Sequence, residues 1–69
     1  MTYEETNVLN FLGETPETWF SRREIARKAV HRREYEENPN WAVAPISALL
    51  LRGLIENNVS GNYKFKPRH

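Results

Sequence analysis

The sequence contains no cysteine and no aspartate, and it has only two histidines. Without a thiol, the chain can form neither a disulfide nor a cysteine zinc site, and it has no catalytic cysteine. His31 and His69, with glutamate as the only other ligand type, are too few for a dedicated transition-metal site. We therefore expect no metal and no other cofactor.

Long apolar runs and secretion signals are also missing. No apolar stretch approaches the roughly twenty residues that cross a bilayer. The chain begins with the polar and acidic residues Thr2, Glu4 and Glu5, unlike the basic and apolar start of a signal peptide. With 69 residues it has room for one small domain. We expect a cytoplasmic protein with no membrane contact.

Glycine is scarce, and the three glycines are too far apart to form a phosphate-binding loop. Glu34, Glu36 and Glu37 are clustered, but paired-carboxylate catalysis needs a concave and partly desolvated site. A polar connecting segment does not supply such a site. We therefore expect that the protein is not an enzyme.

Charge is unevenly distributed along the chain, although the formal net charge is only +1. Residues 1–20 contain four glutamates and no lysine or arginine, whereas residues 21–33 contain six basic residues and only one glutamate. A positive cluster of this kind attracts anions even when the net charge is small. The same pattern also suits a solvated helix face, so charge alone does not decide the function.

Two capping boxes indicate where the first two helices begin. Thr2 and Glu5 have the spacing at which a hydroxyl and a carboxylate each satisfy a free backbone amide at a helix N-terminus. Ser21 and Glu24 repeat this spacing. We predict the first two helices over residues 3–12 and 22–32.

Proline and turn signals predict the remaining elements. Pro45 suits the first turn of a helix, where its missing N–H costs little. Tyr63 and Phe65 alternate with lysines, as in a half-buried strand. The segment 34–40 is polar and is expected to be a connection, with or without a fraying helical turn. We predict a short strand, a third helix and a hairpin over residues 18–20, 42–56 and 58–66.

In this order the elements resemble the winged helix-turn-helix family, and two segments carry the likeness. The run from Ile46 to Glu56, followed by Gly61–Phe65, is similar to the "Leu-x-x-x-Gly-Leu-Ile-Glu, then Gly-x-Tyr" pattern of many bacterial winged-helix regulators. Phe20–Ala26 looks like the entry to the second helix of the family. The resemblance implies one mostly helical α+β domain over residues 1–69, with three helices, a short first strand and a C-terminal wing hairpin.

The resemblance also implies binding to double-stranded DNA, in transcriptional regulation or another DNA transaction at the nucleoid. In the family, the third helix lies in the major groove, while the second helix and the wing contact the backbone. Arginine and lysine suit phosphate contacts, which release counterions from DNA. The candidate DNA-binding residues are Arg22, Arg23, Arg27, Lys28, Arg32, Arg33, Asn40, Ser47, Lys64, Lys66 and Arg68.

The predicted third helix departs from the family pattern, because it has few side chains that could read bases. Ala48, Leu50 and Leu51 stand where the family usually carries charged residues. A helical wheel predicts a second apolar stripe, which either packs under the first helix or the hairpin or forms a partner surface. The alternative function is therefore a winged-helix module for protein–protein interaction or dimerisation, whose stripe consists of Ala44, Ala48, Leu51 and Ile55.

Overall fold

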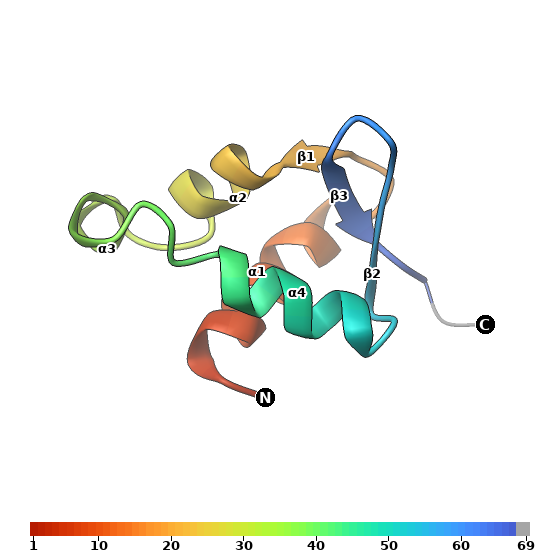
Figure 1. The fold of residues 1–69 in the computed structure, drawn as a ribbon, viewed down its shortest axis with the longest axis horizontal. Helices are drawn as coiled ribbons and strands as arrows, with labels where there is room; N and C mark the ends of the chain where they lie inside the picture. Colours follow the sequence, from red (N-terminus) through yellow and green to blue (C-terminus); the bar gives the residue numbers. More distant parts are fainter. Residues whose placement is uncertain (68–69) are drawn as a thin grey trace.

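The structure is a computed structural model that describes residues 1–67, within which it has four helices and a three-stranded antiparallel sheet (Figure 1). The helices are α1 (Tyr3–Glu14), α2 (Arg22–Lys28), α3 (Arg32–Glu37) and α4 (Val43–Leu51). The strands are β1 (Phe20–Ser21), β2 (Ile55–Asn57) and β3 (Asn62–Phe65). The prediction of a mostly helical α+β fold is confirmed at this level.

Both predicted capping boxes are formed. The Thr2 hydroxyl accepts a hydrogen bond from the Glu5 backbone N–H at 3.1 Å, and the Glu5 carboxylate accepts one from the Thr2 N–H at 3.4 Å. Ser21 and Glu24 make the same pair of contacts at 3.1 and 3.3 Å. The starts of α1 and α2 were therefore predictable from the local sequence.

The predicted second helix over residues 22–32 is wrong, because α2 ends at Lys28. The backbone is extended again at His31, whose N–H donates to the Glu34 carboxylate at 3.2 Å. This contact starts a new helix, α3, in the segment that was expected to be a polar connection. Ion pairs one turn apart, Arg32–Glu36 at 2.8 Å and Arg33–Glu37 at 4.0 Å, run along it.

The predicted third helix over residues 42–56 is too long, because α4 ends at Leu51. Gly53 takes the left-handed conformation with φ of 71°. Its N–H donates to the Leu50 carbonyl at 3.0 Å, and the Leu54 N–H donates to the Leu49 carbonyl at 3.1 Å. This pair of bonds is a Schellman motif, which terminates a helix at glycine.

The chain after the motif forms the hairpin. β3 is the central strand, with the order β1-β3-β2, and the register pairs Ile55 with Phe65 and Phe20 with Tyr63. The first strand therefore lies slightly later than the predicted 18–20. The hairpin begins earlier than the predicted 58–66, because Ile55–Asn57 is strand β2 and not the end of a helix.

The hairpin turn is formed by residues 58–61. The Asn58 side-chain oxygen accepts hydrogen bonds from the backbone N–H groups of Ser60 and Asn62, both at 3.0 Å. Gly61 has φ of 81°, which a residue with a side chain rarely adopts. Val59, at the tip, is fully exposed and has a relative exposure of 106%.

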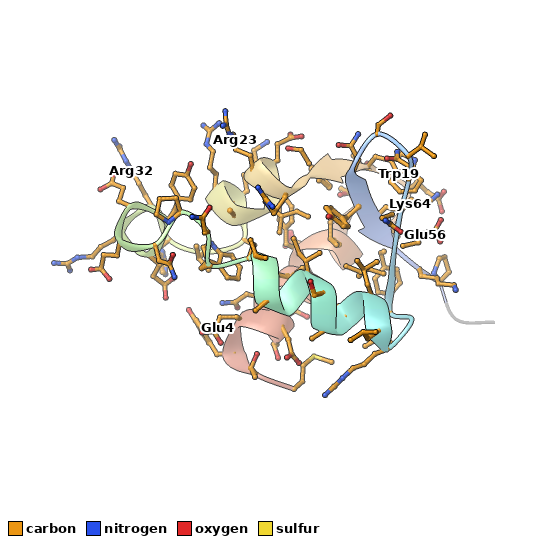
Figure 2. All side chains as sticks on the ribbon, viewed as in Figure 1. Glu4, Trp19, Arg23, Arg32, Glu56 and Lys64 are labelled. Carbon is orange, nitrogen blue, oxygen red and sulfur yellow. The ribbon has the colours of Figure 1, made fainter. Side chains whose placement is uncertain are left out.

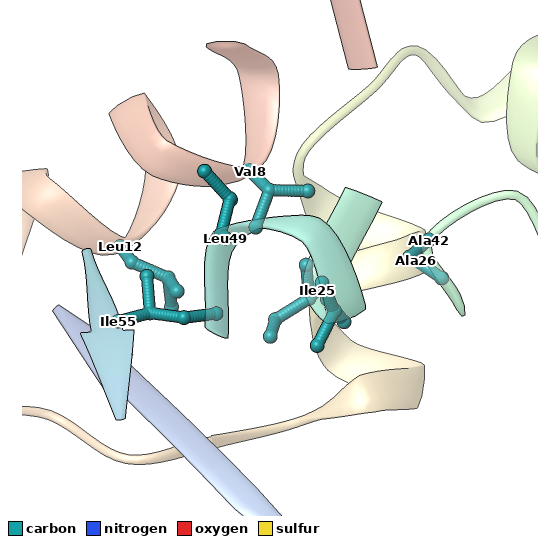
Figure 3. Packing of buried hydrophobic residues seen from close by; sticks show 8 residues of the cluster. Val8, Leu12, Ile25, Ala26, Ala42, Leu49 and Ile55 are labelled. Carbon is teal, nitrogen blue, oxygen red and sulfur yellow. The ribbon is translucent and has the colours of Figure 1, made fainter. Parts of the chain in front are cut away.

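The core lies between α1, α2, α4 and the start of β2 (Figure 3). α1 covers one side of α4, and the sheet lies against the ends of both helices (Figure 1). Within residues 1–67, no helix is both long and apolar enough to cross a bilayer. The fully buried hydrophobic residues are Val8, Leu12, Ile25, Ala26, Ala42, Ile46, Leu49 and Ile55.

Candidate nucleic-acid interface

The predicted phosphate contacts between residues 22 and 33 are divided between two helices. Figure 2 shows Arg23 of α2 and Arg32 of α3 along the same edge of the molecule, with Glu4 on the opposite edge. All of these basic residues are exposed. They are Arg22, Arg23, Arg27 and Lys28 on α2, and Arg32 and Arg33 at the start of α3.

A polar hollow of about 140 Å³ lies between the start of α2, helix α3 and the loop that leads into α4. We call it the arginine hollow. It brings together three of the predicted DNA-binding residues, which come from two separate segments. Its lining residues are Arg22, Arg23, Ala26, Tyr35, Pro39 and Asn40.

Trp41 holds the loop between α3 and α4 beside α2. Its indole Nε1–H donates a hydrogen bond to the Ala26 carbonyl at 2.8 Å, across a separation of fifteen residues. Because Asn40 directly precedes Trp41, this bond keeps the Asn40 amide near the arginines. Tyr35 was not predicted to belong to this site, because the helix that carries it was expected to be a connection. The one feature of the sequence that could have indicated it is an aromatic residue placed among glutamates.

The arginines of α2 differ from those of α3 in their partners. Within residues 1–67, Arg22, Arg23 and Arg27 take part in no ion pair and no side-chain hydrogen bond. Arg32 and Arg33 are each paired with a glutamate of α3. Free guanidinium groups can bind a phosphate without first losing a partner. Among these six basic residues, the three without an acidic partner therefore all lie on α2.

Lys28 does not belong to the arginine hollow. It forms an ion pair with Glu24 at 3.8 Å, and it lines a separate hollow with Tyr3 and Asn7 of α1. The pair is about half exposed, so it contributes little to stability. Lys28 therefore faces a different flank of α2 from Arg22 and Arg23.

The predicted basic residues of the hairpin are not gathered at its tip. The Lys64 ammonium lies 4.8 Å from the centre of the Trp19 ring, which is a cation–π distance (Figure 2). Lys66 lies beyond the end of β3 that is farther from the turn, and it lines a mostly apolar hollow with Leu9 and Leu54. Arg68 lies outside the described residues. The turn itself, residues 58–61, is uncharged.

The outer face of α4 is almost entirely apolar. Leu51 is 89% exposed and Val43 is 42% exposed, and Ser47 is the polar side chain between them. Ala44 is exposed and Ala48 is half-buried. This part of the predicted apolar stripe therefore faces solvent.

Ile55 does not belong to that stripe, and its assignment to a partner surface is wrong. It is only 2% exposed and is one of the fully buried core residues. The reason is the Schellman motif, which ends α4 before this position and turns the chain into β2. The helical wheel does not apply beyond the end of the helix.

No family model matches this chain, and no curated protein or solved structure is detectably similar to it. Within residues 1–67, no three His, Cys, Asp or Glu side chains are grouped closely enough to hold a metal ion. The function must therefore be inferred from the side chains and their placement.

Proposed function

We propose that this protein is a small winged-helix domain that binds double-stranded DNA, mainly through the phosphate backbone. The observation that carries the proposal is the arginine hollow, where Arg22 and Arg23 are unpaired and lie beside the Asn40 amide and the Tyr35 side chain. The process served would be transcriptional regulation or another DNA transaction.

The order of elements supports the winged-helix assignment. Helix α4 is followed by an antiparallel hairpin, and β1, which directly precedes α2, pairs with the central strand of the sheet. One feature departs from the family pattern, because α3 lies between α2 and α4 where a short turn would stand. This extra helix supplies Tyr35, one wall of the arginine hollow.

The chemistry of the arginine hollow suits a phosphate group of DNA. Arginine presents several N–H donors in a planar fork that matches phosphate oxygens. A hydroxyl and an amide add neutral donors on the opposite wall, at Tyr35 and Asn40. Each phosphate contact of this kind makes the affinity fall with added salt.

Helix α4 favours binding that depends little on base sequence. Its outer face offers the Ser47 hydroxyl as its one polar side chain, whereas base edges are mostly recognised by arginine, lysine, asparagine or glutamine. Glu4 and Glu5 lie beside the flank of α4 and repel phosphates there. The duplex therefore approaches from the side of α2.

The test is a fluorescence titration of a mixed-sequence duplex at about 50 mM and about 200 mM salt. We expect micromolar affinity that falls steeply with salt. The Arg23→Ala variant should weaken binding several-fold and make the salt slope shallower by about one. Arg52→Ala is the matched control, because it removes the same charge at the end of α4 that is farther from α2 (Figure 1). Absence of binding at the lower salt would exclude the proposal.

The exposed leucine of α4 favours a second function, contact with another protein. Leu51 is 89% exposed, which is unusual for a leucine on an otherwise apolar helix face. Self-association through this face should be abolished by Leu51→Glu without unfolding the protein. Sedimentation velocity measures the association, and circular dichroism checks the fold. A monomer at high concentration, before any substitution, would exclude dimerisation.

A further inference from the structure

A groove runs between the N-terminal turn of α1 and the flank of α4. Its larger part is a hollow of about 450 Å³, which is within the roughly 300–1,000 Å³ range of ligand sites in proteins. A second hollow of about 170 Å³ shares Glu4, Asn38 and Trp41 with the first. The two hollows are therefore neighbouring parts of one groove, which we call the α1–α4 groove.

The floor of the larger hollow is apolar. Trp41, Ala44, Pro45 and Ala48 line it from the start and the flank of α4. Trp41 is fixed there by its hydrogen bond to the Ala26 carbonyl. The floor therefore offers a rigid apolar surface that a partner side chain can cover.

The rim of the groove is acidic. Glu4 and Glu5 line the larger hollow, Glu4 and Glu34 line the smaller one, and no lysine or arginine lines either. The Tyr3 hydroxyl donates to the Glu34 carboxylate at 3.2 Å and holds it at the groove. Glu4 has no ion-pair or hydrogen-bond partner among residues 1–67. The groove therefore combines an apolar floor with uncompensated negative charge.

We propose that the α1–α4 groove docks a polypeptide segment that carries a basic side chain next to an apolar one. The basic side chain lies in the smaller hollow, where Glu4 and Glu34 supply opposite charge. Tyr3 and Trp41 also line this hollow, and aromatic rings attract cations. The apolar side chain covers the floor of the larger hollow.

Charge complementarity decides among the possible occupants. A duplex would place phosphates beside Glu4 and Glu5, which is repulsive. A two-fold pair of this chain through the groove would bring both sets of these carboxylates into one interface. A basic and apolar segment of another protein meets opposite charge at the rim and an apolar surface at the floor.

This proposal does not depend on DNA binding. Figure 2 shows Glu4 on the opposite edge of the molecule from Arg23, so the groove and the arginine hollow are separate surfaces. Either surface can be occupied while the other is empty. The two proposals can therefore fail separately.

The experiment is a titration of the full, isotope-labelled chain by two-dimensional NMR. The probe is a blocked hexapeptide of alternating arginine and leucine, and the control peptide has glutamate in place of arginine. We expect the arginine peptide to cause saturable shifts of the Trp41 indole N–H and of the Ala44 and Ala48 amides. Saturable shifts are not expected with the glutamate peptide.

A double variant, Glu4→Gln with Glu34→Gln, tests the role of the rim. We expect it to weaken binding of the arginine peptide at least tenfold. The fold should survive, because glutamine at position 34 still accepts the hydrogen bond that starts α3. The matched control is Glu14→Gln with Glu17→Gln, which removes the same charge at exposed positions outside the groove and should leave the affinity unchanged.

Several outcomes would overturn the proposal. One is the absence of saturable shifts, and another is an equal response to both peptides. A third is groove shifts that grow with protein concentration alone, which would identify a second copy as the occupant. A fourth is groove shifts caused by a duplex. Duplex shifts confined to Arg22, Arg23 and Asn40 would instead support the DNA proposal and leave this one intact.

Discussion

Helices α2 and α3 are both short and rich in arginine, but they contribute differently to the fold and to the surface charge. α2 buries Ile25 and Ala26 in the core, whereas α3 has no fully buried residue. Three arginines of α2 are unpaired within residues 1–67, and both arginines of α3 are paired with glutamates. The comparison shows that the number of arginines in a segment does not measure its positive field.

The largest effect is expected from breaking the core contact of α2. Ile25→Ala removes a fully buried side chain and leaves a cavity between α1, α2 and α4. We expect a loss of about 2–5 kcal/mol in the free energy of unfolding. Urea unfolding followed by circular dichroism measures it. A loss below about 1 kcal/mol would mean that α2 contributes no more to the core than α3 does.

An effect of intermediate size on the free energy of unfolding is expected from the residues that begin α2 and α3. Ser21→Ala removes a hydroxyl that accepts the Glu24 N–H, and we expect a loss of about 1 kcal/mol. His31→Ala at the start of α3 should have a much smaller effect, because the His31 side chain makes no capping hydrogen bond. Urea midpoints of the two variants give the difference. Equal losses would contradict this account of the two helix starts.

The arginines of α3 become unpaired, like those of α2, when their glutamate partners are replaced. Glu36→Gln with Glu37→Gln leaves Arg32 and Arg33 without their acidic partners. We expect duplex affinity to rise several-fold and the salt slope to steepen, because more positive charge is available to phosphates. The duplex titration measures both. Unchanged affinity would show that α3 lies away from the bound DNA.

The smallest effect is expected on the free energy of unfolding when Glu36 is replaced. Glu36→Ala breaks the ion pair with Arg32, whose side chain is 91% exposed. We expect a loss of about 0.2–0.5 kcal/mol at low salt, which should vanish near 1 M salt because exposed charges are screened. Thermal unfolding at both salt concentrations checks this. A loss that persists at high salt would indicate a packing role for Glu36.

The starts of α1 and α2 were predictable because a capping box is a local pattern, whereas the start of α3 at His31 was not predicted. Thr2 with Glu5 and Ser21 with Glu24 lie three residues apart, and the same residues make the observed contacts. Helix ends were less predictable. Gly53 carried the signal for the end of α4, but the apolar residues on both sides of it favoured a longer helix.

The site was only partly predictable, because its residues come from distant segments. Arg22, Arg23 and Asn40 were identified by residue type, and they are brought together by the bond between Trp41 and Ala26. No periodicity in the sequence reveals a contact across fifteen residues. A helical wheel placed Leu51 and Ile55 on the same apolar stripe and left open whether that stripe packs inward, whereas in the structure Leu51 is exposed and Ile55 is buried.

The position of β3 in the sheet has a consequence for how the protein is made. Both β1 and β2 pair only with β3 in the sheet described, and residues 62–65 are translated after every other element described. Until residues 62–65 have been made, neither earlier strand has a partner, and Ile55 lacks Phe65, the residue that lies opposite it in the sheet. The helices can form during translation. The sheet must wait for the last few codons of this region, so a ribosome that stalls just before them would hold an incompletely folded chain.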